Sequence, residues 1–103
     1  MDYESLLSVL IKHKKSNLLF KFLENSHLKK KFRRQAVVQG FRESMRREEL
    51  AIATMIWSKN SKFMQEDADD IVESVVQAIE RSPALLAIKT YFLLLLIEEI
   101  SYA

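Results

Sequence analysis

The feature that most constrains this chain is an apolar run near its C-terminal end, YFLLLLI at residues 91–97. A run of this kind covers every side of a helix, so the segment cannot be a surface helix with one wet face. A membrane-spanning helix needs about 20 apolar residues, and here a lysine and a threonine precede the run while two glutamates follow it. We therefore expect a helix over residues 82–100 that lies buried at the centre of the fold, or one that another chain partly covers. Ser82 and Pro83 mark its start, since serine caps free N–H groups and proline is tolerated in the first turn.

The composition indicates an all-α fold in a single helical domain spanning residues 1–103. Hydrophobic residues make up 49% of the chain, which is enough for one core at this length. A single glycine and a single proline leave little for the tight turns of β-hairpins, while the abundant Leu, Lys, Glu, Ala and Arg favour helices. There is no cysteine, which excludes a disulfide framework and a thiolate metal site. Residues 1–15 lack the basic start of a secretory signal, so we expect an intracellular protein, cytoplasmic or nuclear.

Apolar stripes and polar breaks predict five or six helices, packed as an irregular bundle or a short stack of α-hairpins around the buried C-terminal helix. The segment 26–47 is the hardest to interpret, because Phe32 lies on one side of a helix while Phe41 and Met45 lie on nearly the opposite side. A single straight helix would need partners on both faces. We therefore expect one bent helix or two short ones, with the break near residues 35–38. The expected helices cover residues 2–12, 16–24, 26–47, 48–58, 66–81 and 82–100.

Short helices and polar turns recur along the chain with a spacing that suggests repeats. The segments LLFKFLEN (18–25) and AIATMIWSKN (51–60) end alike, about 35 positions apart. This recurrence resembles an ankyrin or other α-hairpin repeat only in its general pattern. The ankyrin T-P-L-H turn motif is absent, and so is the tetratricopeptide pattern, so the recurrence assigns no family.

Charge is distributed unevenly along the chain, although the net charge is only +2. Residues 1–47 carry a net charge of +8 and residues 48–103 a net charge of −6. Such asymmetry indicates an anionic partner for the basic half, or electrostatic pairing within or between chains. The alternative is a solvated basic face whose Phe32 and Phe41 anchor it to the core. The basic segment contains one acid, Glu43, and eight cations: Lys29, Lys30, Lys31, Arg33, Arg34, Arg42, Arg46 and Arg47.

Catalytic and metal chemistry find little support in the sequence. The acidic run EDADD at residues 66–70 lacks the glycine and ligand spacing of a calcium-binding loop and suits a helix N-terminus instead. His13 and His27 are too isolated for a metal site. One glycine excludes nucleophile elbows and glycine-rich phosphate loops. We expect no enzyme activity, no cofactor and no metal.

These observations predict a non-enzymatic protein-binding module, an adaptor, regulator or accessory factor that recognises an acidic partner through the basic segment. Trp57 is expected to add to the binding surface, because tryptophan is enriched at interfaces. The alternative hypothesis is a nucleic-acid-binding protein that uses residues 29–47 for phosphate contacts. Self-association is a further expectation, since the basic and acidic halves of two copies could meet. The sequence leaves open whether the basic segment meets protein, nucleic acid or the chain's own acidic half.

Overall fold

The computed structural model describes the backbone of residues 3–24 and 30–101 and the side chains of residues 5–24, 34–62 and 64–101. Six α-helices and one short 3-10 helix make up the regular structure of these ranges, and the predicted all-α class with five to six helices is confirmed. The elements are α1 (Tyr3–Lys12), α2 (Ser16–Leu23), α3 (Lys30–Arg46), α4 (Leu50–Met64), η1 (Gln65–Asp67), α5 (Ala68–Arg81) and α6 (Leu86–Ser101).

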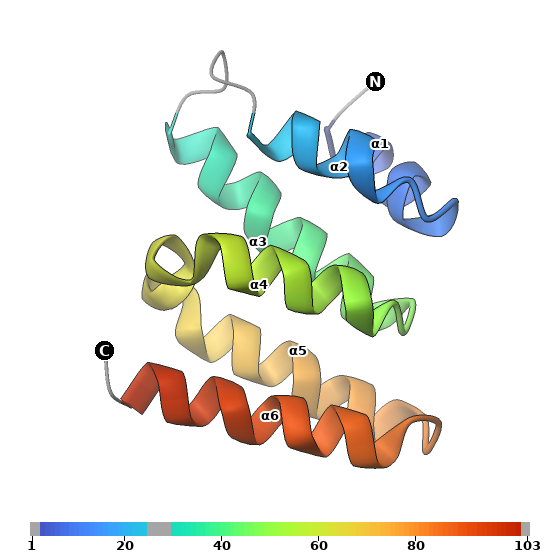
Figure 1. The fold of residues 1–103 in the computed structure, drawn as a ribbon, viewed down its shortest axis with the longest axis vertical. Coiled ribbons are helices and arrows are strands. Elements are labelled where there is room, and N and C mark those ends of the chain that lie inside the picture. Colours follow the sequence, from blue (N-terminus) through green and yellow to red (C-terminus); the bar gives the residue numbers. More distant parts are fainter. Residues whose placement is uncertain (1–2, 25–29, 102–103) are drawn as a thin grey trace.

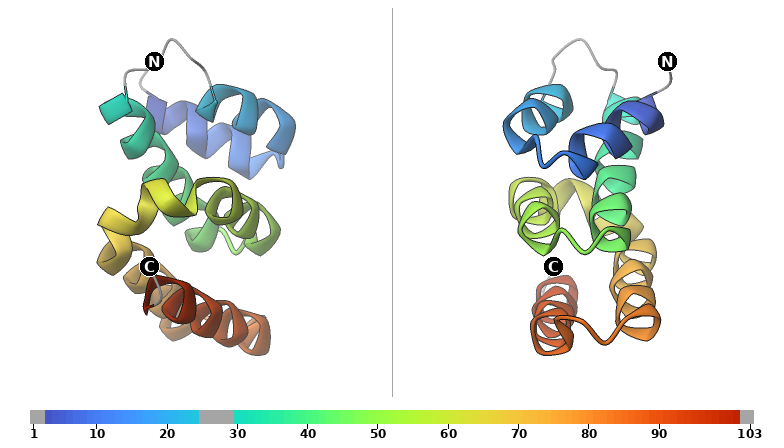
Figure 2. Two further views of the ribbon diagram at one scale, coloured as in Figure 1. Left: turned by 60° about the vertical axis from the view of Figure 1, so that its left-hand side comes forward. Right: turned by 90° about the vertical axis from the view of Figure 1, so that its right-hand side faces the viewer.

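The helices form three consecutive hairpins that lie one upon another (Figure 1). Helices α1, α3 and α5 pack in one row, and α2, α4 and α6 occupy a second row beside it (Figure 2). The shortest extent of the molecule is only 18 Å, which is about two helix diameters. The fold is therefore the short α-hairpin stack that was one of the two expected arrangements.

Helix α3 occupies the centre of this stack, in the place that the sequence assigned to the C-terminal helix. It packs against α1 on one side, against α5 on the other and against α4 within its own hairpin. The predicted break near residues 35–38 is wrong, since α3 runs without interruption through Gly40 to Arg46. Helix α3 has neighbours on two sides, as a continuous helix with apolar residues on opposite faces would need, while the side chain of Phe32 lies outside the described part.

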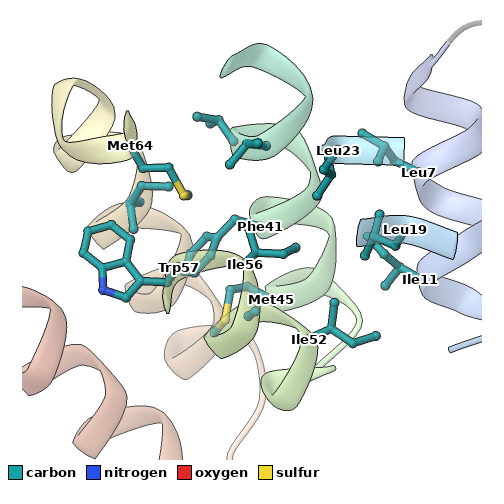
Figure 3. Close-up of a cluster of buried hydrophobic side chains, with 14 of the residues drawn as sticks. Leu7, Ile11, Leu19, Leu23, Phe41, Met45, Ile52, Ile56, Trp57 and Met64 are labelled. Carbon is teal, nitrogen blue, oxygen red and sulfur yellow. The ribbon is translucent and has the colours of Figure 1, made fainter. Parts of the chain in front are cut away.

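The core follows from this central position (Figure 3). Val37, Phe41 and Met45 are fully buried, and the ring of Phe41 lies 5.9 Å from that of Phe92 on α6. At Gly40, where α1 and α4 both approach α3, a Cβ would meet Ile56 Cδ1 at 3.5 Å and Leu7 Cδ2 at 4.0 Å, which are ordinary packing distances. The remaining core side chains on α1, α2, α4 and α5 converge on α3 from both sides. They include Leu7, Ile11, Leu19, Leu23, Ile52, Ile56, Trp57, Met64, Ile71 and Val75.

Helix α6 corrects one part of the prediction, because it lies at the edge of the stack and is not surrounded. Its main neighbour is α5, and only Lys89, Phe92 and Leu96 are buried along it. The physical reason is the linear order of the hairpins, which leaves the last helix with nothing beyond it. An all-round apolar helix is therefore covered on one side only.

Two helix ends differ from the expected ones. Asn60 has non-helical backbone angles (φ −131°, ψ 16°) and its side chain donates to Ile56 O at 2.9 Å, so the polar break at this position kinks α4 instead of ending it. Ser82 holds the turn before α6, where its hydroxyl accepts the Ala84 N–H at 3.2 Å, and the helix itself begins only at Leu86. The expected starts of the first and third helices, at residues 2 and 26, lie outside the described residues.

The edge position of α6 predicts that two leucines of this helix contribute very differently to the free energy of unfolding. Leu96 is fully buried whereas Leu94 is 59% exposed. We expect Leu96→Ala to lower the free energy of unfolding by about 2–5 kcal/mol, because it leaves a cavity. Leu94→Ala should change it by less than about 0.5 kcal/mol when unfolding is measured on the single chain at high dilution, because this side chain buries little surface within the chain. Urea unfolding followed by circular dichroism measures both, and equal losses would show that α6 is surrounded after all.

Candidate interaction surfaces

The chain's own acids form ion pairs with three of the four cations of the basic segment whose side chains the structure describes. Arg34 on α3 bridges to the second half of the chain, with Nε 2.7 Å from Asp67 Oδ2 and Nη1 2.5 Å from Glu66 Oε2. The hydrogen bonds with Asp67, followed by those with Glu66, raise the pKa of Arg34. This contact links α3 to η1, so the role of Arg34 in the described structure is to hold these two elements together.

Arg46 and Arg47 are engaged as well, by the one acid within the basic segment. Glu43 accepts from Arg46 Nη2 at 2.5 Å, from Arg47 Nε at 2.7 Å and from the Ser8 hydroxyl at 3.1 Å. The hydrogen bond from Arg46, supported by those from Arg47 and Ser8, lowers the pKa of Glu43 to about 2 against the opposing effect of burial. The cluster therefore joins α1 to the C-terminal turn of α3.

Arg42 is the exception among the cations whose side chains the structure describes in this segment. It is exposed and has no ion pair or hydrogen bond within the described residues. Lys30, Lys31 and Arg33 belong to α3, but their side chains lie outside the described part, and Lys29 lies outside it altogether. Among the predicted cations with described side chains, Arg42 is thus the one that the described residues leave unpaired.

Arg42 lies in a groove between α3 and α5. A hollow of about 220 Å³ runs along this seam, with Arg42 and Arg46 on one wall and Arg81 on the other. Arg81 donates to Arg46 O at 3.1 Å, which places its guanidinium at the C-terminal end of α3, where the carbonyl groups favour a cation. The other lining residues are Gln39, Glu43, Ser74 and Gln77.

A second hollow of about 380 Å³ continues the first towards η1. The two share Gln39 and Arg42, so together they form one path along the α3–α5 seam, called here the α3–α5 groove. Its far end contains Asp67 and Asp70. The groove therefore carries positive charge at one end and mixed charge at the other.

Trp57 does not contribute to a surface as expected. Its side chain is only 4% exposed and its Nε1–H donates to Glu99 Oε2 on α6. The indole fills the space between α4 and α6 and satisfies its one polar group there, as buried tryptophans usually do. In this structure the ring is not available to a partner.

Lys89 is a buried cation that sequence reasoning missed. Its side chain is fully buried, and Nζ donates to Glu48 Oε1, Ala78 O and Ser82 O at 3.1–3.2 Å. The three acceptors satisfy all three N–H groups of the ammonium. The hydrogen bond from Lys89, followed by that from Ser82, lowers the pKa of Glu48. The signal in the sequence was the lysine within the apolar run, which fastens α6 to the end of α5 and to the α3–α4 turn.

The outer side of α6 is the largest apolar surface in the described part of the chain. Ten large apolar side chains are exposed in the described part of the chain. Seven of them lie between residues 85 and 97, each 39–65% exposed. These seven are called here the α6 face: Leu85, Leu86, Ile88, Tyr91, Leu94, Leu95 and Ile97. Monomeric proteins rarely leave a contiguous patch of this kind uncovered unless it takes part in an interaction.

Covering the α6 face would release substantial free energy. A fully buried large apolar side chain contributes about 1.5–3 kcal/mol, so seven half-exposed ones represent on the order of 7 kcal/mol. Association costs roughly 4–15 kcal/mol in lost freedom of motion. Two such faces that cover each other represent about 14 kcal/mol, which exceeds all but the upper end of that cost.

Neither a metal site nor a membrane span appears in the described residues. None of their His, Asp and Glu side chains gather in threes in a way that could hold a metal ion. None of the described helices combines the length and the apolarity needed to cross a bilayer.

Comparison of the chain with protein-family models, curated proteins and solved structures finds no match. Function must therefore be inferred from the surfaces themselves.

The Glu43 cluster predicts a specific dependence of stability on pH. Because the folded pKa of about 2 lies below the ordinary value of 4.5, Glu43 stabilises the protein above pH 4.5 and loses this contribution as the pH falls towards 2. We expect Glu43→Gln to cost on the order of 1–2 kcal/mol at neutral pH, after allowance for solvent screening, and progressively less in acid. Urea unfolding across this pH range measures the difference. Glu80→Gln, on the exposed side of α5, is the matched control, and a Glu43 difference that stayed constant with pH would contradict the assignment.

Proposed function

We propose that the protein is a non-enzymatic protein-binding module, and that it binds an acidic segment of another protein in the α3–α5 groove. The observation that supports this is the convergence of Arg42, Arg46 and Arg81 on one hollow. Glu43 is the one acid among the described residues that line this hollow, and Arg46 and Arg47 already engage it. A carboxylate from a partner would complement the remaining positive charge.

The rest of the groove favours a protein ligand over a nucleic acid. Gln39, Ser74 and Gln77 supply neutral donors and acceptors of the kind that meet a peptide backbone. Asp67 and Asp70 line the continuation of the groove, where they would repel a run of phosphates. A peptide with acids at one end and neutral residues at the other would suit both ends.

In this mechanism Arg42 makes the first contact. Its guanidinium is exposed and forms no ion pair with any acid among the described residues, so it can form a bidentate pair with a carboxylate. Arg34 would contribute less, because Glu66 and Asp67 already occupy it. An adaptor or regulatory role is consistent with a site that binds and releases without chemistry.

Fluorescence anisotropy with a labelled glutamate-rich peptide and a labelled single-stranded oligonucleotide tests this proposal. We expect the peptide to bind, and Arg42→Glu to weaken its binding by about tenfold because a contact is replaced by a repulsion. Lys21→Glu on α2 is the matched control, since it makes the same charge change on an exposed surface away from the groove. It should lower the affinity far less.

Two outcomes would overturn the proposal. Equal losses for the two variants would mean that only net charge matters and that the groove is not the site. An oligonucleotide that binds more tightly than the peptide, and that Arg42→Glu releases, would establish nucleic-acid binding in its place.

A further inference from the structure

The exposed side of α6 carries four residues whose spacing is the same from either end. Ala87, Tyr91, Leu94 and Glu98 lie on the side of the helix opposite buried Lys89, Phe92 and Leu96, with spacings of four, three and four residues. Such spacing is typical of a seam at which two helices pack side by side. Tyr91 and Leu94, at its middle, are the two most exposed large apolar residues of the chain's described part.

We propose that this seam binds the same seam of a second copy, with the two α6 helices antiparallel about a two-fold axis. This inference is independent of the α3–α5 groove, which is lined by residues of α3, α5 and η1 and by none of α6. The α6 helix lies at the free end of the stack in both views of Figure 2, so its outer side is open to a second molecule.

Apolar matching favours a second copy as the occupant. Outside the α6 face, the exposed large apolar side chains of the described residues are Val9, Leu18 and Met55, on three different helices. No other described surface of this chain could cover seven apolar side chains. The α6 face itself does so, because a two-fold contact sets equal surfaces against each other.

Charge selects the antiparallel arrangement. Glu98 is exposed near the C-terminal end of α6, where a helix disfavours negative charge. At the other end Leu85, with φ of 57°, precedes the first helical residue and has no side-chain acceptor for the N–H groups of the first turn. An antiparallel pair places Glu98 opposite Ala87 of the second copy, beside the first turn of that copy's α6, where a helix favours negative charge. A parallel pair would instead set two Glu98 carboxylates together.

The flanks of the seam agree with this arrangement. With Tyr91 opposite Leu94 of the second copy, Ile88 and Leu95 of both copies meet along one edge. Thr90 and Ile97 meet along the other. Most of the α6 face is thereby covered, while Ala87 leaves room for the carboxylate opposite it.

The mass of the full chain in solution tests the proposal. We expect light scattering after size exclusion to give twice the 12.1 kDa chain mass. Leu94→Asp should raise the dimer dissociation constant by about 100-fold or more, since the residue occurs twice in the interface, and should leave the circular dichroism spectrum unchanged because Leu94 makes no core contact. Leu18→Asp, an equally exposed leucine at the far end of the stack, is the matched control and should remain dimeric.

Cysteine cross-linking tests the direction of the helices, and the absence of native cysteine makes every disulfide diagnostic. Ala87→Cys combined with Glu98→Cys should give a covalent dimer on mild oxidation. These two positions lie about 16 Å apart along one helix, too far for a bond within one chain. Either substitution alone should give little covalent dimer, because residue 87 of one copy faces residue 98 of the other and never a second residue 87.

Several results would overturn the proposal. They are a monomer at all concentrations, a dimer that Leu94→Asp leaves intact, and dissociation by Leu18→Asp to the same extent. Efficient cross-linking by Glu98→Cys alone would show a parallel pair and refute the antiparallel arrangement.

Discussion

The packing of α3 against both of its neighbours is the contact on which the rest of this structure depends. Val37, Phe41 and Met45 are fully buried along it, and every hairpin of the stack reaches the core through this helix. A helix with apolar residues on two sides gains nothing from standing alone, because only partners on both sides remove those residues from water. The middle position of the α3–α4 hairpin follows, with the α1–α2 hairpin on one side and the α5–α6 hairpin on the other.

Electrostatic pairing between distant parts of the chain then fixes how the layers meet. Arg34 joins α3 to η1, Glu43 joins α3 to α1 through Ser8, and Lys89 joins α6 to the α3–α4 turn through Glu48. Some charges of the positive half of the sequence therefore pair with charges of the negative half within the molecule. Exposed pairs of this kind add little stability, but hydrogen-bonded ones restrict the geometry between elements. Among the described side chains, the charge that remains for a partner is smaller and more local than the overall charge split indicates.

The fold class and most helix positions could be predicted from the sequence, because apolar stripes such as Ile71 and Val75 reveal one buried face directly. The ranking of the helices by burial could not. The apolar run at residues 91–97 is more hydrophobic than anything in α3, yet α3 is central and α6 is peripheral. Periodicity shows which residues avoid water, but the partner that covers them is decided by tertiary packing or by another chain.

The candidate site was predictable as a segment and not as individual residues. Clustered cations between residues 29 and 47 pointed to α3, but whether each one is free depends on acids that are distant in sequence, such as Asp67 for Arg34. Trp57 illustrates the same limit, since its hydrogen-bond partner Glu99 is 42 residues away. Local sequence contains no record of these pairings.

The linear order of the hairpins also bears on how the protein unfolds. Helix α6 makes its main contacts with α5, and the α5–α6 hairpin reaches the rest of the core mainly through α3. In such nearest-neighbour architectures terminal units open at lower cost than central ones. Amide hydrogens of α6 should therefore exchange earlier than those of α3, and the buried ammonium of Lys89 acts as the latch that delays this opening. A molecule bound to the outside of α6 would stabilise the closed form of this hairpin. The resistance of the α5–α6 hairpin to proteolysis would then rise with the concentration of that molecule.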